Sequence, residues 1–333
     1  TPQDTTEQKQ DLTVATQKHV PMQFLSSELT LSLDDFSDRI IEPAMMVLAA
    51  NAESDCLTMA KDVYNQTGTP GTTPNTALPY LTAHAIVSGG LAPIGKRCYH
   101  IRPLDNATLV DALKALQQSA PDIAEQYREG IMGRAFGGDW YENTLMPRIT
   151  VGNKVASVVV SGGSQTGSSL TIGGVSAADT FLKGQVFTIQ GVNSVHPESR
   201  ADTGQLQKFV VTADTTSAGS TVAIPISPSI VVTGALQTVN GSPANNAPIT
   251  FDGTANLQYG MNLHFYKTAF AVVFADLDMP KGLDFAHREQ VDGISLRVLR
   301  QFEARTDLWV TRADILYGYK TIRPEFACRI ATS

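Results

Sequence analysis

The sequence predicts an α+β protein whose chain is interrupted by a separate all-β domain. A long helical pattern near the N-terminus carries the α part. The composition then changes sharply between residues 149 and 264, which hold fourteen of the 26 glycines but only nine charged residues. Short runs rich in β-branched residues recur there between turn residues, as in small barrels and sandwiches. We therefore expect an inserted β-barrel at 149–264, after which the first domain resumes at 265–333.

The first residues read as an extended segment, which we place at 1–31. Val14, Val20, Met22 and Phe24 share one parity in a run that is otherwise polar. Alternation of this kind predicts a half-buried edge strand. The sequence opens on a threonine and has no initiator methionine, so we expect a truncated or processed start.

A helical period replaces the alternation from residue 32 onward. Ser32 and Asp35 resemble a capping box, and apolar residues then recur at helical spacing to about Tyr64. We expect one long helix over 32–64, bent at Pro43 because proline removes a backbone donor. This helix would belong to a domain segment at 32–105, followed by a further segment at 106–148.

The remaining elements follow from shorter patterns. Helices are expected at 106–119 and 121–131, the latter opening on Pro121. A polar turn is expected at 284–293. Strands are expected at the following ranges: 140–151, 265–274, 294–302, 309–316 and 321–330.

Bulk composition excludes several classes of protein. The chain has 333 residues, 42% of them hydrophobic, and a net charge of −7. It has no run of lysine and arginine, so a dedicated nucleic-acid surface is not expected. The three cysteines are far apart and form no zinc or disulfide pattern. No apolar stretch reaches the roughly 18 residues that a membrane span needs, so no membrane partner is expected.

One motif resembles a phosphate-binding loop. The stretch Gly90 to Lys96 has the glycine spacing and the lysine. However, Arg97 stands where a hydroxyl should bind Mg²⁺, and Pro93 removes a backbone N–H that would cradle phosphate. We interpret this stretch as a turn that enters a strand.

Other candidate sites are weaker still. The six histidines are isolated, and Asp276 with Asp278 is more typical of a solvated strand end or an ion pair than of a metal site. Gly133 to Gly138 does not match a dinucleotide fingerprint, and we interpret it as a helix end with a flexible connection. We therefore expect no catalytic, cofactor-binding or metal-binding residue, and no enzyme activity.

Charged residues of alternating sign mark the last third of the chain. Arginine forms bidentate bonds with carboxylates, so such a pattern suits a subunit that docks against several neighbours. An ordinary charged surface explains it equally well. The residues are Arg288, Glu289, Asp292, Arg297, Arg300, Glu303, Arg305, Asp307, Arg312, Asp314, Arg323, Glu325 and Arg329.

Several stretches resemble the coat-protein family of short-tailed phages that infect Salmonella and its relatives. At the N-terminal side they are residues 26–46, 61–64 and 68–74. Within and after the insert they are residues 183–192, 207–212, 267–271, 292–297 and 312–320, followed by Arg323-Pro-Glu. The resemblance covers nearly the whole chain.

The resemblance implies an HK97-like capsid fold. Residues 1–31 would be the second half of an extended loop, and the spine helix at 32–64 would lie in a peripheral domain at 32–105. Residues 106–148 would be shared by peripheral and axial domains, which 265–333 would complete around the inserted barrel. The family's N-terminal arm has no counterpart in this sequence.

The function implied is that of a major capsid protein. The partners would be further copies of the chain in hexamers and pentamers, a scaffolding protein, a portal at one vertex, and packaged double-stranded DNA bound without sequence specificity. The location would be the virion, after assembly in the host cytoplasm. The insert is expected to aid folding and to set contacts across capsomers.

Three alternatives stay open. A carbohydrate-binding adhesin would need clustered aromatic residues, and the insert has no tryptophan. An enzyme would use the loop from Gly90 to Lys96. Another phage structural protein, such as a tail tube, would share the β-rich composition.

Overall fold

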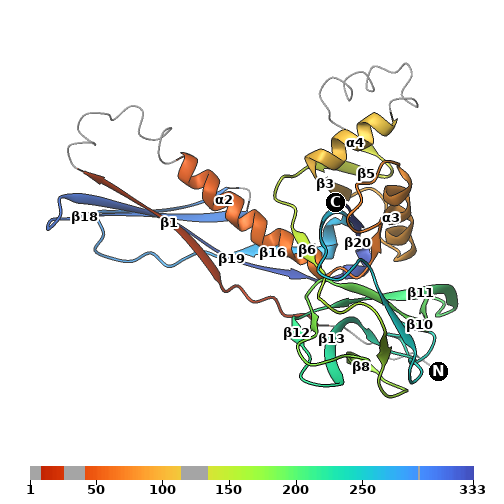
Figure 1. The fold of residues 1–333 in the computed structure, drawn as a ribbon. Helices are drawn as coiled ribbons and strands as arrows, with labels where there is room; N and C mark the ends of the chain where they lie inside the picture. Colours follow the sequence, from red (N-terminus) through yellow and green to blue (C-terminus); the bar gives the residue numbers. More distant parts are fainter. Residues whose placement is uncertain (1–8, 26–41, 114–133, 292) are drawn as a thin grey trace, which may run out of the picture. The chain divides into compact units, whose positions relative to one another are not determined.

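The computed structural model describes residues 9–25, 42–113, 134–291 and 293–333 (Figure 1). The predicted cap at Ser32, the N-terminal part of the predicted spine helix and the predicted helix at 121–131 lie outside these residues. The chain forms two compact units. One comprises Thr58–Phe270 with Thr321–Ser333, and the other comprises Gln8–Leu57 with Ala271–Lys320.

The second unit is built on an antiparallel sheet in the order β1-β19-β18-β17, with β16 also paired to β19. Strand β1 pairs in register from Thr16 opposite Tyr317 to Leu25 opposite Leu308. The strands are β1 (Thr16–Leu25), β16 (Phe270–Phe274), β17 (Phe285–Val291), β18 (Ile294–Glu303) and β19 (Leu308–Thr321).

Helix α2 (Glu42–Leu57) covers one face of this sheet (Figure 1). Leu48 and Ala52 are buried against Ala313, Ile315 and Tyr317 of β19. The alternation predicted for β1 is confirmed, because its even-numbered residues are the less exposed ones.

The predicted spine helix differs in its last turn. The α-helix ends at Leu57, and a 3₁₀ turn, η2 (Thr58–Asp62), takes the chain onward. Pro43 lies in the first described turn of α2, so the bend predicted there falls at the boundary with residues 26–41, which lie outside the described ranges.

The first unit contains a mixed sheet in the order β2-β20-β15-β3-β5-β4, and β6 also pairs with β15. Helix α3 (Leu78–Gly89) packs against this sheet, and α4 (Pro103–Leu113) follows β3. The strands are β2 (Gln66–Thr67), β3 (Arg97–Ile101), β4 (Arg134–Ala135), β5 (Gly138–Glu142), β6 (Arg148–Thr150), β15 (Gln258–Tyr266) and β20 (Ala327–Ala331).

A closed six-stranded barrel in the same unit confirms the all-β insert. Its interior is filled by aliphatic residues and by Phe187, Phe209 and Phe251, whose rings contact one another. In barrel order the strands are β10 (Val186–Val195), β11 (Asp202–Val211), β13 (Thr221–Ile230), β8 (Gly167–Gly173), β7 (Val158–Val160) and β14 (Pro248–Phe251). A short pair, β9 (Thr180–Phe181) with β12 (Thr215–Thr216), lies outside the closed barrel.

The local structure departs from the sequence prediction at three places. The stretch expected as a polar turn at 284–293 is largely strand β17, because pairing with β18 outweighs its polar composition. Arg134 to Gly138, expected to be a flexible connection, form a tight hairpin of strands β4 and β5 with positive φ at Phe136 and Gly137. The helix expected before it lies outside the described residues. Helix α3 was not predicted at all.

Other boundaries moved by a few residues. The helix expected from 106 begins at Pro103. The strand expected over 140–151 is split into β5 and β6, and the one expected over 265–274 is interrupted by a 3₁₀ turn at Lys267–Ala269. The last strand begins only at Ala327, after a 3₁₀ turn at Pro324–Phe326.

Candidate functional site

The loop from Gly90 to Lys96 is not built to bind a phosphate. It connects helix α3 to strand β3, the reverse of the strand–loop–helix order of a phosphate-binding loop. The Arg97 guanidinium donates to the carbonyl oxygens of Pro93 at 3.1 Å and Ala92 at 2.5 Å. The carbonyl oxygens of the loop thus face the Arg97 guanidinium, and a phosphate would meet acceptors where it needs donors. This confirms the interpretation of a turn that enters a strand.

Two histidines come together inside the first unit. The His84 and His264 rings lie 5.8 Å apart, and Arg97 Nη1 lies 3.3 Å from His84 Nδ1. His264 is fully buried and stacks on Tyr99 at 3.9 Å, while its Nδ1 lies 3.1 Å from the Cys98 carbonyl oxygen. Burial lowers the pKa of His264 to about 3, which keeps the ring neutral. The pair is therefore part of the core.

Of the two aspartates after β16, Asp276 forms an ion pair through its carboxylate and Asp278 accepts a hydrogen bond through its backbone. The Asp276 carboxylate lies 3.7 Å from the Arg288 guanidinium, and the backbone carbonyl of Asp278 accepts from Arg297. Across the described ranges, no three His, Cys, Asp or Glu side chains are grouped so that they could hold a metal ion.

The alternating charges of the last third converge on Asp314. This carboxylate is fully buried, and it accepts from Arg297 Nη2 at 2.7 Å and from Arg312 Nε at 2.6 Å. Arg297 lies opposite Asp314 in the β18–β19 register, so the sheet itself fixes the pair. A buried carboxylate needs such partners because removing it from water costs several kcal/mol. Taking away one partner of a buried pair lowers stability by about 3–5 kcal/mol. The cluster therefore ties strand β18 to strand β19.

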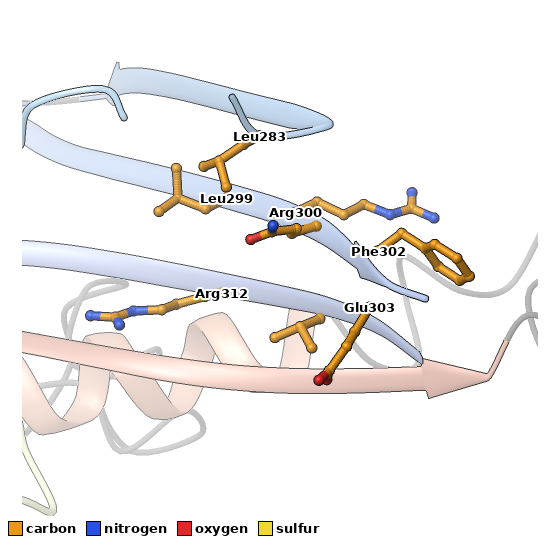
Figure 2. Close-up of a pocket in the computed structure, with 8 residues that line it drawn as sticks. Leu283, Leu299, Arg300, Phe302, Glu303 and Arg312 are labelled. Carbon is orange, nitrogen blue, oxygen red and sulfur yellow. The ribbon is translucent and has the colours of Figure 1, made fainter. Parts of the chain in front are cut away.

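A groove of about 420 Å³ opens farther along the same sheet (Figure 2). Leu283 lies over Leu299, and Arg300 packs its guanidinium 4.2 Å from the Trp309 ring centre. The lining combines apolar and charged side chains and includes one carboxylate, that of Glu303: Leu283, Leu299, Arg300, Gln301, Phe302, Glu303, Val310 and Arg312. Such a lining suits contact with a side chain better than chemistry on a substrate.

A buried arginine connects the barrel to the mixed sheet of the first unit. Arg329 on β20 is fully buried, and its Nη2 donates to the Gly184 carbonyl oxygen at 3.0 Å. Gly184 has φ +94°, and a Cβ there would meet Lys61 at 3.4 Å. That contact would be an ordinary one, so the turn before β10 favours glycine because of its positive φ and not for lack of space.

Ion pairs surround this connection. Lys183 Nζ lies 2.8 Å from an Asp62 oxygen, and Lys208 Nζ donates to the Gln66 carbonyl oxygen at 2.8 Å. Lys208 also pairs with Asp252 at 3.3 Å. The sequence pattern suggested ion pairs in the last third only, because the charged residues of the barrel are few and widely spaced.

Strand β1 ends the sheet of the second unit. Within the described residues, no strand pairs with its outer side. Its approach is fixed: the Thr13 backbone lies so close to Gly318 that a Cβ would clash, and Lys320 Nζ donates to the Asp11 carbonyl oxygen at 2.7 Å. An edge of this kind is a ready template for pairing with another chain.

None of the helices in the described ranges combines the length and the apolarity needed to cross a bilayer.

Comparisons with known proteins were made for the sequence and for the fold. No similar protein was found among curated sequences. A chain from Mycobacterium phage Che8 shares 11% identity, with 96% of this chain and 71% of that chain covered and a TM-score of 0.45. The capsid of Cyanophage P-SCSP1u gives 9% identity, 97% and 73% coverage and a TM-score of 0.46. The CUS-3 coat protein I-domain is 27% identical over 29% of this chain and 96% of its own, with a TM-score of 0.21.

The sequence match to a family is more extensive. The family described as P22 coat protein, gene protein 5, matches residues 3–329. This range includes both compact units and the whole barrel. The resemblance noted on separate stretches of sequence is thereby confirmed over nearly the full length. The chain belongs to the P22 coat protein family.

Proposed function

We propose that copies of this chain form the hexamers and pentamers of an icosahedral phage head that encloses double-stranded DNA. Its family makes it a major capsid protein with the HK97-like fold, and the match over residues 3–329 carries this conclusion. The proposal adds two points to this family assignment: the arrangement of the copies in hexamers and pentamers, and the DNA that the shell encloses.

The sheet of the second unit supports assembly from identical subunits. Its outermost strands, β1 and β17, each have one side that pairs with no other strand in the described ranges. A neighbouring copy can complete such an edge, and repeated contacts of this type close into rings and shells. Many weak contacts then stabilise each subunit by mass action.

In this proposal, each predicted segment of the chain belongs to a named domain of the capsid fold. We place residues 1–31 in an extended loop, 32–105 in the peripheral domain, 106–148 at its junction with the axial domain, and 265–333 in the completion of both. The insert at 149–264 has its own apolar interior and is tied to the sheet by Arg329. Its role in this proposal is to support folding and to set contacts across capsomers.

The remaining partners follow from the same role. A scaffolding protein would guide closure and a portal would occupy one vertex, in the host cytoplasm before the virion is complete. The net charge of −7 favours weak contact with packaged DNA. The role is structural and not enzymatic, which fits a Gly90–Lys96 loop whose carbonyls face a cation.

Electron microscopy of the purified chain with its scaffold tests the proposal. Closed isometric shells are the expected result. Tubes would favour a tail component instead, and dispersed single subunits would oppose both. Deleting residues 153–260 should lower particle yield and stability. Normal particles in normal yield from that deletion would contradict the role given to the insert.

A further inference from the structure

We propose that the loop from Gly90 to Lys96, here called the Ile94 loop, is a preformed contact point for a second copy of this chain. The inference rests on the proposed assembly of copies into a shell. It assigns one part of the surface to that assembly.

The tip of the loop is apolar and faces solvent. The Ile94 side chain is 91% exposed, and Leu91 is 41% exposed. Pro93 between them is exposed as well. Leu78 and Leu81 are also exposed, but they lie at the far end of helix α3, roughly 13–18 Å along the helix from the loop, and are not part of this surface. Single exposed apolar residues are ordinary, but three at the tip of one loop suit a surface that a partner covers.

The loop is held rigidly despite its exposed tip. Arg97 is only 2% exposed, and besides Ala92 and Pro93 it donates to Ser88 Oγ at 2.6 Å. Gly90 sits so close to the Glu325 carbonyl oxygen that a Cβ would lie 2.6 Å from it. A buried cation and a close backbone approach thus fix the position of Ile94.

Leu91 adds a second sign of constraint. Its φ is +65°, a region that leucine rarely adopts and that costs about 1 kcal/mol or more. The surrounding hydrogen bonds keep it there, with Leu91 N–H donating to the Ser88 carbonyl oxygen at 3.0 Å. A segment that is already ordered loses little entropy on association, which favours a role in binding.

Charge points to a copy of the same chain as the partner. The chain carries 32 aspartates and glutamates and a net charge of −7, yet none of the acidic residues lies between Asp62 and Asp105. In the fold, Arg134 joins the exposed Lys96 at this loop, because its Nη2 donates to the Gly95 carbonyl oxygen at 3.1 Å while its Nη1 pairs with Asp139 at 3.2 Å. Lys96, Arg134 and Asp139 together leave one positive charge beside Ile94. A basic apolar point on an acidic subunit can approach a second subunit with little charge repulsion.

Two substitutions test the loop without disturbing the fold. Ile94→Ser changes an exposed side chain, and Leu91→Asn places a residue that tolerates positive φ. Leu206→Ser, at a leucine of the barrel that is 44% exposed, is the matched control. Ile94→Ser and Leu206→Ser should melt within about 1 °C of wild type, because surface changes cost little. Leu91→Asn should melt no lower than wild type, because asparagine tolerates the positive φ. Ile94→Ser should raise the protein concentration needed for assembly about tenfold, and Leu206→Ser less than about twofold.

A labelling experiment reads burial directly. In an Ile94→Cys variant, N-ethylmaleimide should react quickly in free subunits and at least about tenfold more slowly in assembled particles, as expected for a side chain in an interface core. Equal rates in both forms, or Ile94→Ser assembly equal to wild type, would overturn the inference. Wild-type chain that forms no particles would instead overturn the proposed function, and this contact with it.

Discussion

The guanidinium of Arg329 reaches the carbonyl oxygen of Gly184 at 3.0 Å, across 145 residues of sequence. This bond ties the last strand of the mixed sheet to the turn that enters the inserted barrel. This side chain connects the two parts of the first unit. Because it is fully buried, water cannot replace the Gly184 carbonyl oxygen as its acceptor. The stability of the connection depends on that side chain.

Arg329→Ala should destabilise the first unit by about 3 kcal/mol, because it leaves a cavity and an unpaired carbonyl. Each unit has one tryptophan, Trp140 in the first and Trp309 in the second. Urea unfolding followed by Trp140 fluorescence in a Trp309→Phe background isolates the first unit. Arg323→Ala, whose guanidinium stacks on Phe326 at 5.2 Å, is the control and should cost less than about 1 kcal/mol. Equal effects of the two changes would contradict the role given to Arg329.

Asp314→Asn should destabilise the second unit by about 3–5 kcal/mol, because two guanidinium groups would face a neutral amide. Trp309 fluorescence in a Trp140→Phe background follows this unit during unfolding. The control is Asp276→Asn, whose carboxylate is 52% exposed at 3.7 Å from Arg288. Exposed pairs contribute about 0–1 kcal/mol, so the control should change little. A loss below about 1 kcal/mol for Asp314→Asn would show that the cluster does not hold the strands.

Acid should weaken the first unit through His264. Unfolded, this histidine takes up a proton near pH 6.5, whereas burial in the folded state lowers its pKa to about 3. The unfolded state therefore binds more protons between these values, and stability is complete above pH 6.5 and falls as the pH drops toward 3. The slope from this one group is at most about 1.4 kcal/mol per pH unit.

The test compares wild type with His264→Phe, which keeps an aromatic ring beside Tyr99. Stability from urea unfolding at a series of pH values should vary less steeply for the variant. His84 adds a smaller effect of the same sign, because burial and Arg97 lower its pKa as well. Identical slopes for the two proteins would mean that His264 does not titrate as its surroundings require.

Gly137→Ala should destabilise the hairpin between β4 and β5 by about 2 kcal/mol or more, since alanine is strained at positive φ and its Cβ would strike the His84 ring. Gly191→Ala is the matched control, because its φ of +81° is similar but open space surrounds it. The control should cost about 1 kcal/mol. Thermal melting of both variants measures the difference, which should vanish if the contact with His84 is unimportant.

Elements with a strong period were predictable from sequence. The alternation in β1 and the glycine-rich, charge-poor insert both gave the observed structure, because burial on one face or inside a barrel imposes a pattern. Helix α3 was missed because Gly68 to Pro79 reads as a loop and the helix that follows exposes Leu78 and Leu81, which blurs its polar face. The strand β17 was missed because an edge strand can remain polar.

The surfaces and connections were less predictable than the fold. Arg329 and Gly184 are joined only by the tertiary structure, and no local spacing marks them. Arg97 lies only four and five residues from the carbonyls of Pro93 and Ala92, but a bond from a side chain to the backbone leaves no sequence pattern. The Gly90–Lys96 motif resembles a phosphate loop because both need glycine at tight turns. Arg97 at the hydroxyl position and Pro93 already argue against a phosphate loop in the sequence, and the carbonyl oxygens that face Arg97 show the difference in the structure.

Sedimentation velocity of the purified chain with its scaffold tests the central claim most directly. The account predicts that the 35.7 kDa subunit disappears into one fast-sedimenting species above a threshold concentration, the mark of a closed shell. A single slow species of subunit mass at every concentration, with the fold intact by circular dichroism, would contradict it.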